Sequence, residues 1–290
     1  METAVSSDKK ILVGCGEWGF REMPMERHFE IAQSFGFKFL EFGIGGGKLG
    51  RLSEKPEDSE IQGFLDLGHR FQVATPFCCI ENDFTLRDPK AHRRMVEKVL
   101  QQMATAWKCQ ATHVRLFAGF TPLSEMTEAL WKQMLDALNE CQTMAEALGL
   151  QVALETHGAI EHGIHGEAVH VPTVTTDREA LRRLLAEMPG KIGINYDPGN
   201  IKAAAGSAKG LHLDLLNDRI NYCHLKDWKR QGKGWIACGV GDDDLDYGVL
   251  IPKIRFDGVY LIEYEPLHDT EDGIRRSLES LKASGLLLTM

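Results

Sequence analysis

The sequence lacks several features that would place a protein in a membrane or outside the cell. No apolar run approaches the ~20 residues of a membrane-spanning helix, and the N-terminal METAVSSDKK has no apolar signal core. The seven cysteines, an odd number, follow no repeated spacing, which favours reduced thiols over a disulfide framework. We therefore expect a water-soluble protein of the cytoplasm that has no membrane partner.

Positive charge is also in short supply. The chain has 33 Lys and Arg against 42 Asp and Glu, a formal net charge of −9, which disfavours generic attraction to nucleic acid or to anionic membranes. The basic stretches at 91–98 and 179–187 have acidic neighbours and helical spacing, which is typical of solvated helix faces. The charge balance predicts that nucleic acid is not a partner.

The chain has no Gly/Ser linker and no low-complexity tract, so we expect a single domain over residues 1–290. It also lacks a dinucleotide-binding GxGxxG loop. The stretch GCGEWG puts Glu17 and Trp18 where such a loop would approach a pyrophosphate. This absence disfavours a doubly wound dinucleotide-binding fold, which is the structural alternative to a closed (β/α)8 barrel.

Short apolar runs alternate with longer segments of helical period, as in repeated βα units of the α/β class. Several helical segments follow Asp, Ser or Thr and end at Gly, as capping predicts. Eight strand-like runs and eight helical segments predict a closed (β/α)8 TIM barrel. The runs lie at 10–16, 37–43, 70–77, 112–119, 150–158, 191–199, 220–228 and 258–266. The helical segments lie at 23–36, 58–69, 88–109, 123–149, 175–190, 212–219, 246–256 and 270–285.

Polar residues end the last four of these runs, one on each. In a (β/α)8 barrel the functional groups collect at the C-terminal ends of the strands. Three carboxylates and one imidazole there suit Mn²⁺, Mg²⁺ or Co²⁺, with Zn²⁺ also possible. Each residue alone could equally be an ordinary polar strand end, but four in register favour a metal site, formed by Glu155, Asp197, His224 and Glu263.

Five motifs carry a resemblance to a known family: ALETHG (153–158), INYDPGN (194–200), NYCHLKDW (221–228), GVGDDDLDY (239–247) and YLIEYEP (260–266). Together they resemble the xylose isomerase-like sugar isomerase and epimerase superfamily, which also contains inosose dehydratase and AP endonucleases that use three zinc ions. The resemblance covers nearly the whole chain. It implies one divalent metal ion per chain, bound by Glu155, Asp197, His224 and Glu263, and it implies that Glu155 and Glu263 also act as catalytic acid and base.

The activity implied by the resemblance is isomerisation or epimerisation of a sugar, sugar phosphate or cyclitol. Proton abstraction next to a carbonyl would proceed through a metal-stabilised enediolate. An inosose-dehydratase-like lyase and a non-catalytic sugar-binding barrel are the alternatives. An endonuclease is disfavoured, because Asn200 replaces a histidine of that pattern and the stretch 229–246 contains no histidine. Glu265 shares the strand parity of Glu263 and is the rival fourth ligand.

Other polar and aromatic residues near the predicted mouth are candidates for substrate contact: Trp18, Glu41, Arg115, His157, Asn200 and Lys226. Each has a structural alternative. His157 could be a loop histidine, Lys226 could pair with Asp227 and orient His224, and Arg115 or Glu41 could form a salt bridge inside the barrel. Aromatic residues could wall a sugar ring or could simply pack, and these are Trp18, Phe20 and Trp228.

A long insertion follows the fifth strand, at 157–176. Its histidines, His157, His162, His165 and His170, could suggest a second metal site, but we expect a mobile loop that covers the mouth and excludes water. Barrels of this family often associate, so a homo-oligomer is a further expectation from the resemblance. The sequence has no apolar stripe that identifies an interface.

Overall fold

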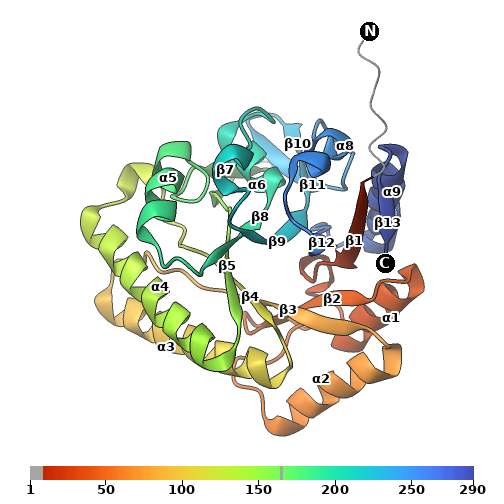
Figure 1. The fold of residues 1–290 in the computed structure, drawn as a ribbon, viewed down its shortest axis with the longest axis horizontal. Coiled ribbons are helices and arrows are strands. Elements are labelled where there is room, and N and C mark those ends of the chain that lie inside the picture. Colours follow the sequence, from red (N-terminus) through yellow and green to blue (C-terminus); the bar gives the residue numbers. More distant parts are fainter. Residues whose placement is uncertain (1–8, 164–165) are drawn as a thin grey trace.

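A closed barrel of eight parallel strands forms the centre of the protein (Figure 1). The computed structural model describes residues 9–163 and 166–290. The barrel strands pair in the order β12-β9-β8-β5-β4-β3-β2-β1, and β1 pairs back with β12, which closes the sheet. They are β1 (Lys10–Cys15), β2 (Phe39–Ile44), β3 (Ala74–Ile80), β4 (His113–Leu116), β5 (Gln151–Glu155), β8 (Gly193–Tyr196), β9 (Ile220–Leu225) and β12 (Val259–Ile262). The predicted (β/α)8 fold is confirmed.

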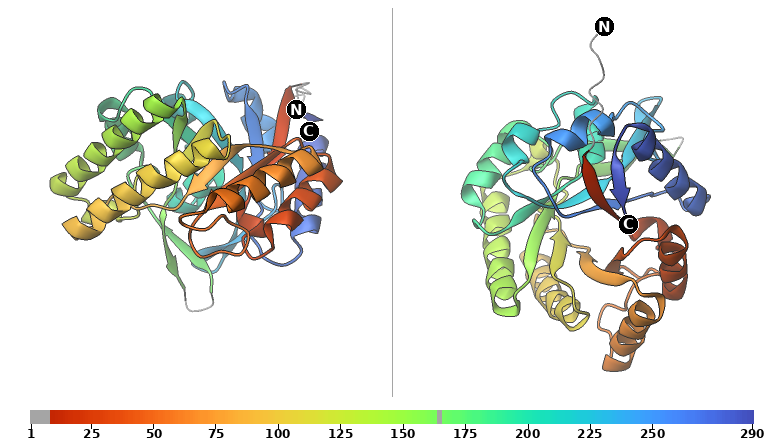
Figure 2. Two further views of the ribbon diagram at one scale, coloured as in Figure 1. Left: turned by 90° about the horizontal axis from the view of Figure 1, so that it is seen from below. Right: turned by 45° about the vertical axis from the view of Figure 1, so that its right-hand side comes forward.

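Helices surround the barrel and cover its outer face (Figures 1 and 2). The α-helices are α1 (Met25–Phe35), α2 (Asp58–Phe71), α3 (Pro89–Lys108), α4 (Glu128–Leu148), α5 (Arg178–Glu187), α6 (Pro198–Ala205), α7 (Leu213–Leu216), α8 (Tyr247–Leu250) and α9 (Thr270–Ala283). Short 3-10 helices are η1 (Trp18–Phe20), η2 (Leu123–Glu125) and η3 (Ile251–Lys253). None of the helices in the described ranges is both long and apolar enough to cross a membrane.

Capping chemistry explains where several helices begin and end. The Asp88 side chain accepts from the backbone N–H groups of Lys90 and Ala91 at the start of α3, and Thr127 caps α4 in the same way. Gly36 ends α1 with φ +82°, a left-handed conformation that glycine adopts without steric cost. These caps define where the helices begin and end between successive strands.

The start of the third strand lies well beyond its predicted position. The third run was expected at 70–77, but β3 occupies Ala74–Ile80 because Arg70 and Phe71 complete the last turn of α2. Gln72 then takes a left-handed conformation with φ 56° and ends the helix. The apolar side chain of Phe71 packs against the core from the helix, so apolar character alone could not separate helix end from strand start.

Two apolar layers hold the barrel together. A large buried cluster fills the space between strands and helices, and a smaller one fills the barrel interior with Phe77, Ala153, Tyr222, Val259 and Leu261. Strand β13 (Leu287–Thr289) pairs with the first half of β1. The neighbouring strand β2 pairs with β1 at its other end, at Cys15↔Leu40. All seven cysteines lie within the described residues and are unpaired, as the sequence predicted.

A second, antiparallel sheet stands outside the barrel and was not predicted. It has the order β10-β11-β7-β6 and consists of β6 (Ala159–His162), β7 (Ala168–Val171), β10 (Asp227–Gln231) and β11 (Gly234–Cys238). The expected loop at 157–176 is thus largely a β-hairpin, which projects from the barrel (Figure 2, left). His162 and His170 lie on its strands, whereas His165 lies outside the described residues.

Candidate active site

Four neighbouring barrel strands bring the predicted metal ligands together. Glu155 ends β5, Asp197 follows β8, His224 lies in β9 and Glu263 follows β12. One potential ligand atom from each of these side chains lies within 4.8 Å of those of the other three. All four residues are buried. Glu265, the rival ligand, is not in this group, so the geometry favours Glu263 as the fourth member.

Asp197 is held by the start of α6. One carboxylate oxygen accepts the backbone N–H of Asn200 at 2.9 Å, and the other accepts the Asn200 side-chain amide at 3.0 Å. Burial and the nearby carboxylates of Glu155 and Glu263 raise the pKa of Asp197 to about 7, although Lys226 opposes the rise. Such crowding of negative charge in a buried place is unfavourable unless a cation compensates it.

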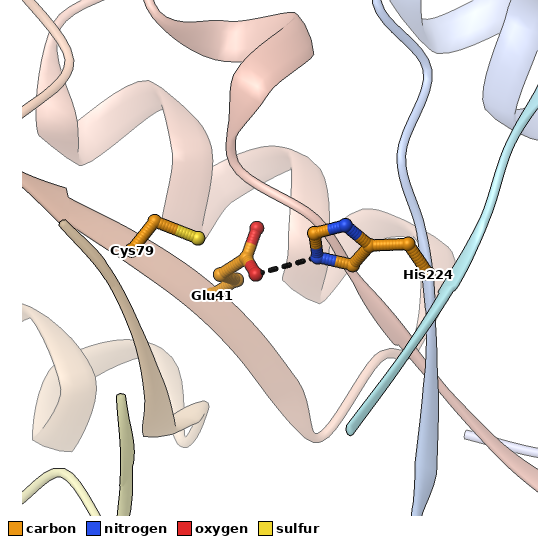
Figure 3. Close-up of side chains that lie close together, drawn as sticks. All are labelled: Glu41, Cys79 and His224. Carbon is orange, nitrogen blue, oxygen red and sulfur yellow. Dashed lines mark hydrogen bonds and ion pairs between the residues drawn. The ribbon is translucent and has the colours of Figure 1, made fainter. Parts of the chain in front are cut away.

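His224 is oriented by a carboxylate from across the barrel, Glu41 on β2 (Figure 3). The His224 Nε2 lies 2.8 Å from Glu41 Oε1, and because a carboxylate can only accept, Nε2 carries the proton. The Tyr222 hydroxyl donates to the same oxygen at 2.5 Å, and the Glu17 N–H donates to Oε2 at 3.0 Å. The other imidazole nitrogen, Nδ1, lies 3.5 Å from Glu263 and 3.8 Å from Glu155.

This arrangement changes the role expected for Glu41. We predicted that Glu41 contacts substrate, but its side chain is fully buried and does not line the cavity at the barrel mouth. A carboxylate that holds the distal nitrogen of a ligand histidine fixes the ring and increases its basicity. The geometry therefore makes Glu41 a positioning residue for His224. This corresponds to the alternative of a salt bridge inside the barrel, with His224 as the partner.

Cys79 lies beside Glu41, and Cys79, Glu41 and His224 form a second set with potential ligand atoms within 4.8 Å (Figure 3). Burial, together with the Glu41 carboxylate, raises the pKa of the Cys79 thiol well above its ordinary value, although Arg115 opposes the rise. Metals bind the thiolate rather than the thiol. Because the Cys79 thiol is held in its protonated form and Glu41 is engaged by the Nε2–H of His224, we interpret this set as support for His224 rather than as a second metal site.

Glu155 is kept charged by Arg115, which lies on β4. The Arg115 Nε lies 3.0 Å from Glu155 Oε2, and the Asn200 amide donates to Oε1 at 3.0 Å. Burial alone would raise the pKa of Glu155, but the Arg115 guanidinium and the His224 ring hold it well below its usual range. Asn200 is thus placed behind Glu155 and Asp197 and away from the cavity, in contrast to the predicted substrate contact.

Lys226 places an ammonium group among three carboxylates. Its Nζ lies 2.6 Å from Glu263, 2.6 Å from Glu265 and 3.3 Å from Asp197. Burial would lower the pKa of Lys226, but these carboxylates raise it well above its ordinary value. The alternative Lys226–Asp227 ion pair does not form, because Asp227 pairs with Lys202 at 2.7 Å.

A cavity of about 500 Å³ opens above these groups at the barrel mouth. Of the predicted contact residues, Trp18, Arg115, His157 and Lys226 line it. Phe20 and Trp228 do not line it: Phe20 is fully buried, and the Trp228 indole N–H donates to the Asn200 side-chain oxygen at 3.1 Å. The remaining cavity residues are Glu81, Phe117, Phe120, Pro122, Glu155, Ala159, Ile160, Glu161, Glu263 and Glu265.

His157 presents a neutral imidazole to this cavity. Its Nδ1 donates to the carbonyl oxygen of Gly158 at 2.6 Å, which leaves Nε2 as an acceptor. Burial lowers the pKa of His157, although Glu155 opposes this. The ring stands edge-on to Phe117 and Phe120, with centroids 5.2 and 5.5 Å away. This setting suits a hydrogen bond from a substrate hydroxyl.

Sequence reasoning missed several cavity residues. Glu81 directly follows β3, but the expected run stopped at residue 77, so its position at a strand end was not recognised. Phe117 and Phe120 follow β4 and form an apolar side of the cavity. Ile160 and Glu161 come from the β6–β7 hairpin, so part of the segment expected as a lid borders the mouth.

The group of four fits a divalent cation on its own chemistry. Two candidate ligand oxygens, Glu155 Oε2 and Glu263 Oε2, are buried and make ion pairs but no further hydrogen bond among the described residues. Each faces a cationic side chain but retains lone pairs. Three carboxylates with one imidazole nitrogen form a hard to borderline ligand set. The donors present therefore match the metal that the sequence led us to expect.

A parallel eight-stranded barrel with its polar groups gathered at the C-terminal strand ends defines a protein of the TIM-barrel class. More narrowly, the chain belongs to the xylose isomerase-like TIM barrel family, whose model matches residues 29–284. No curated protein matches the chain.

Solved structures share the fold over nearly the whole chain. The IOLI protein with a bound zinc atom is 18% identical, covers 95% of this chain and 98% of its own, and has a TM-score of 0.72. The 3-keto-D-glucoside 4-epimerase YcjR of E. coli is 13% identical, with coverage of 95% and 99% and a TM-score of 0.67. The probable 3-DHS dehydratase AsbF of Bacillus anthracis is 16% identical, with coverage of 94% and 98% and a TM-score of 0.69.

Proposed function

We propose that this protein is a divalent-metal-dependent isomerase or epimerase of a sugar or cyclitol. The observation that carries the proposal is the convergence of three buried carboxylates and one imidazole within 4.8 Å of one another, two of which, Glu155 and Glu263, line the cavity. The epimerase and the zinc-bound protein among the structural neighbours support it. Glu155, Asp197, His224 and Glu263 would hold the cation.

Proton transfer is the chemistry assigned to Glu155 and Glu263. Both line the cavity and approach it from different strands, so one can take a proton from a substrate carbon while the other returns a proton. A bound divalent cation would supply positive charge for the oxygen next to that carbon. Arg115 keeps Glu155 ionised, which is the charge state that a proton acceptor needs.

The charges of the cavity favour an uncharged substrate. Its glutamates outnumber its cations, Arg115 and Lys226, by five to two. Both cations are already engaged with carboxylates, so among the described lining residues neither is free to receive a phosphate or a carboxylate. Trp18, Phe117 and Phe120 offer apolar surface for the face of a sugar ring.

Dehydration is a second candidate reaction, and one observation favours it. The Lys226 ammonium lies 2.6 Å from Glu263, so a proton donor stands beside a candidate base. After proton abstraction, loss of a neighbouring hydroxyl as water needs such a donor. The dehydratase among the structural neighbours supports this alternative.

The test combines metal content with hydrogen exchange. The protein is loaded with Mn²⁺, and ketoses and inososes are screened in deuterated water for exchange of carbon-bound hydrogen. Glu155→Gln and Glu263→Gln are each expected to abolish exchange, because each removes one proton-transfer carboxylate. The exposed Glu279→Gln is the matched control and should exchange like the unaltered protein.

Metal content, hydrogen exchange and the product formed distinguish the candidate functions. About one bound metal per chain with exchange supports an isomerase or epimerase, and accumulation of a dehydrated product supports the lyase. Exchange that persists in both glutamine variants contradicts the two-carboxylate mechanism. A protein that binds sugar but neither holds added metal nor exchanges hydrogen is a binding barrel, and the proposal is then incorrect.

A further inference from the structure

Lys226 is held in place more firmly than a solvated lysine needs to be. Its backbone N–H donates to the Tyr247 hydroxyl at 3.1 Å, and that hydroxyl donates to the Lys226 carbonyl oxygen at 2.6 Å. A Cβ at Gly199 would lie 2.6 Å from the same carbonyl oxygen, so α6 packs directly against this peptide. The backbone of Lys226 is therefore fixed by two neighbouring segments.

The side chain of Lys226 is directed into the ligand group. Its ammonium contacts Glu263 and Asp197, which are two of the four candidate ligands, and only 2% of the side chain is exposed. Its third partner, Glu265, lies outside the ligand group and is itself 15% exposed. An ammonium thus shares two carboxylates with the candidate metal site and has a separate carboxylate available beside it.

We infer that Lys226 is an internal competitor of the divalent cation, and that Glu265 is the carboxylate that retains its ammonium when a cation takes Glu263 and Asp197. The inference rests on the metal site of the proposed function. It makes Lys226 a positioning residue that sets metal affinity, and it makes Glu265 the residue that allows Lys226 to yield.

Two electrostatic effects act together at this place. Without a divalent cation, Lys226 compensates buried carboxylates that would otherwise repel one another. With the cation present, the ammonium is a like charge at close range, and its repulsion weakens binding. Lys226 therefore stabilises the metal-free protein and opposes metal binding through the same contacts. Glu265 limits the second effect because it holds the ammonium outside the ligand group.

The affinity of the full chain for Mn²⁺ tests the inference, with free Mn²⁺ measured by its electron paramagnetic resonance signal. Lys226→Met and Lys226→Gln are expected to bind Mn²⁺ at least about tenfold more tightly, because each removes the competing charge. Lys226→Arg keeps the charge and should remain near the unaltered protein. Glu265→Gln should bind about tenfold more weakly, because the ammonium then remains on Glu263.

Thermal unfolding is a second readout that a purely structural lysine would not move in this way. Lys226→Met should unfold at a lower temperature without metal, yet Mn²⁺ should raise its unfolding temperature by more than that of the unaltered protein. The matched control is Lys202→Met, which removes a second buried lysine that also has three carboxylate partners but contacts none of the candidate ligands. Its Mn²⁺ affinity should be unchanged.

Failure of the inference differs from failure of the proposed function. If the unaltered protein binds Mn²⁺ and both neutral variants bind it equally or more weakly, the inference is overturned and the metal site remains. If the unaltered protein and every Lys226 variant bind no more Mn²⁺ than Asp197→Asn does, both are overturned. If Lys226→Met does not fold, Lys226→Gln and Glu265→Gln decide the question.

Discussion

Two buried lysines, Lys202 and Lys226, each pair with three carboxylates but lie in different surroundings. The Lys202 Nζ lies 2.7 Å from each of Asp227, Asp243 and Asp244. The side chains of Asp243 and Asp244 are 22% and 67% exposed and belong to the loop between β11 and α8. The partners of Lys226 instead stand at or just beyond the ends of barrel strands, where the closed sheet fixes their positions.

The difference distinguishes an ion cluster that holds a loop from the ion cluster of the candidate metal site. Around Lys202, a loop brings its carboxylates to the cation, so the cluster fastens that loop to α6 and β10. Around Lys226, the barrel sets the carboxylates first, and Asp197, Glu263 and Glu265 then share one ammonium. A surplus of fixed negative charge is what a divalent cation requires.

The largest expected effect tests whether the Lys202 cluster stabilises the fold. Lys202→Met should lower the free energy of unfolding by ~3–5 kcal/mol, the usual cost of leaving a buried charge without its partner. Asp227 would be that unpaired charge, since both side chains of the Lys202–Asp227 pair are fully buried. Urea unfolding monitored by circular dichroism measures the change.

The exposed pair of Lys132 and Asp136 provides the control for that measurement, with 77% and 60% of their side chains exposed. Lys132→Met should change the unfolding free energy by less than ~1 kcal/mol, as surface pairs do. A Lys202→Met variant as stable as the Lys132→Met control would contradict the view that the Lys202 cluster fastens the loop.

Much of the fold and the convergence of the four candidate metal ligands could be predicted because they depend on local pattern. Short apolar runs ending in Glu155, Asp197, His224 and Glu263 indicate both strands and their functional ends, and closure of the barrel then brings the four together. The antiparallel sheet outside the barrel was missed because its strands are only four or five residues long. The turn at Gln231–Gly234, between Trp228 and Trp235, was the available hairpin signal.

Roles that depend on packing could not be predicted from spacing. Glu41 lies within β2 and Asn200 in the first turn of α6, and only the three-dimensional contacts show that they face His224 and Glu155. The same applies to Lys226, because its choice between Asp227 and the ligand carboxylates depends on side-chain direction. The sequence identified which polar residues lie near the barrel mouth. The structure was needed to show which of them line the cavity and which lie behind those residues.

A second, smaller effect would sharpen the functional side of the comparison. Glu41→Gln should weaken Mn²⁺ binding by about 10–100-fold, the range found when the partner of a metal-ligating histidine is lost. The neutral amide no longer compensates the Nε2–H of His224, although the ring can remain in place. Isothermal titration with Mn²⁺ measures the loss.

Two reference variants bracket that result. His224→Ala removes a ligand and should weaken binding more than Glu41→Gln does, whereas Cys79→Ser keeps a hydrogen-bond donor beside Glu41 and should bind like the unaltered protein. Equal affinities for Glu41→Gln and the unaltered protein would remove Glu41 from the support of the site.

The smallest effect extends the comparison from lysines to two buried imidazoles. His224 lies among carboxylates, whereas His28 on α1 contacts backbone oxygens, with Nε2 2.9 Å from the carbonyl of Phe20. Burial lowers the pKa of His28 to about 4, below the 6.5 of an unfolded histidine, so the unfolded chain binds more protons between these values. The contribution of His28 to stability is therefore complete above pH 6.5 and decreases as the pH falls toward 4.

Between pH 7 and 5.5 the contribution of His28 should decrease by about 1 kcal/mol, and His28→Gln, which does not titrate, should lack this part of the pH dependence. Urea unfolding of both proteins at the two pH values isolates the difference, since all other titrating groups are common to them; parallel pH dependences would show that His28 is not buried in the neutral form.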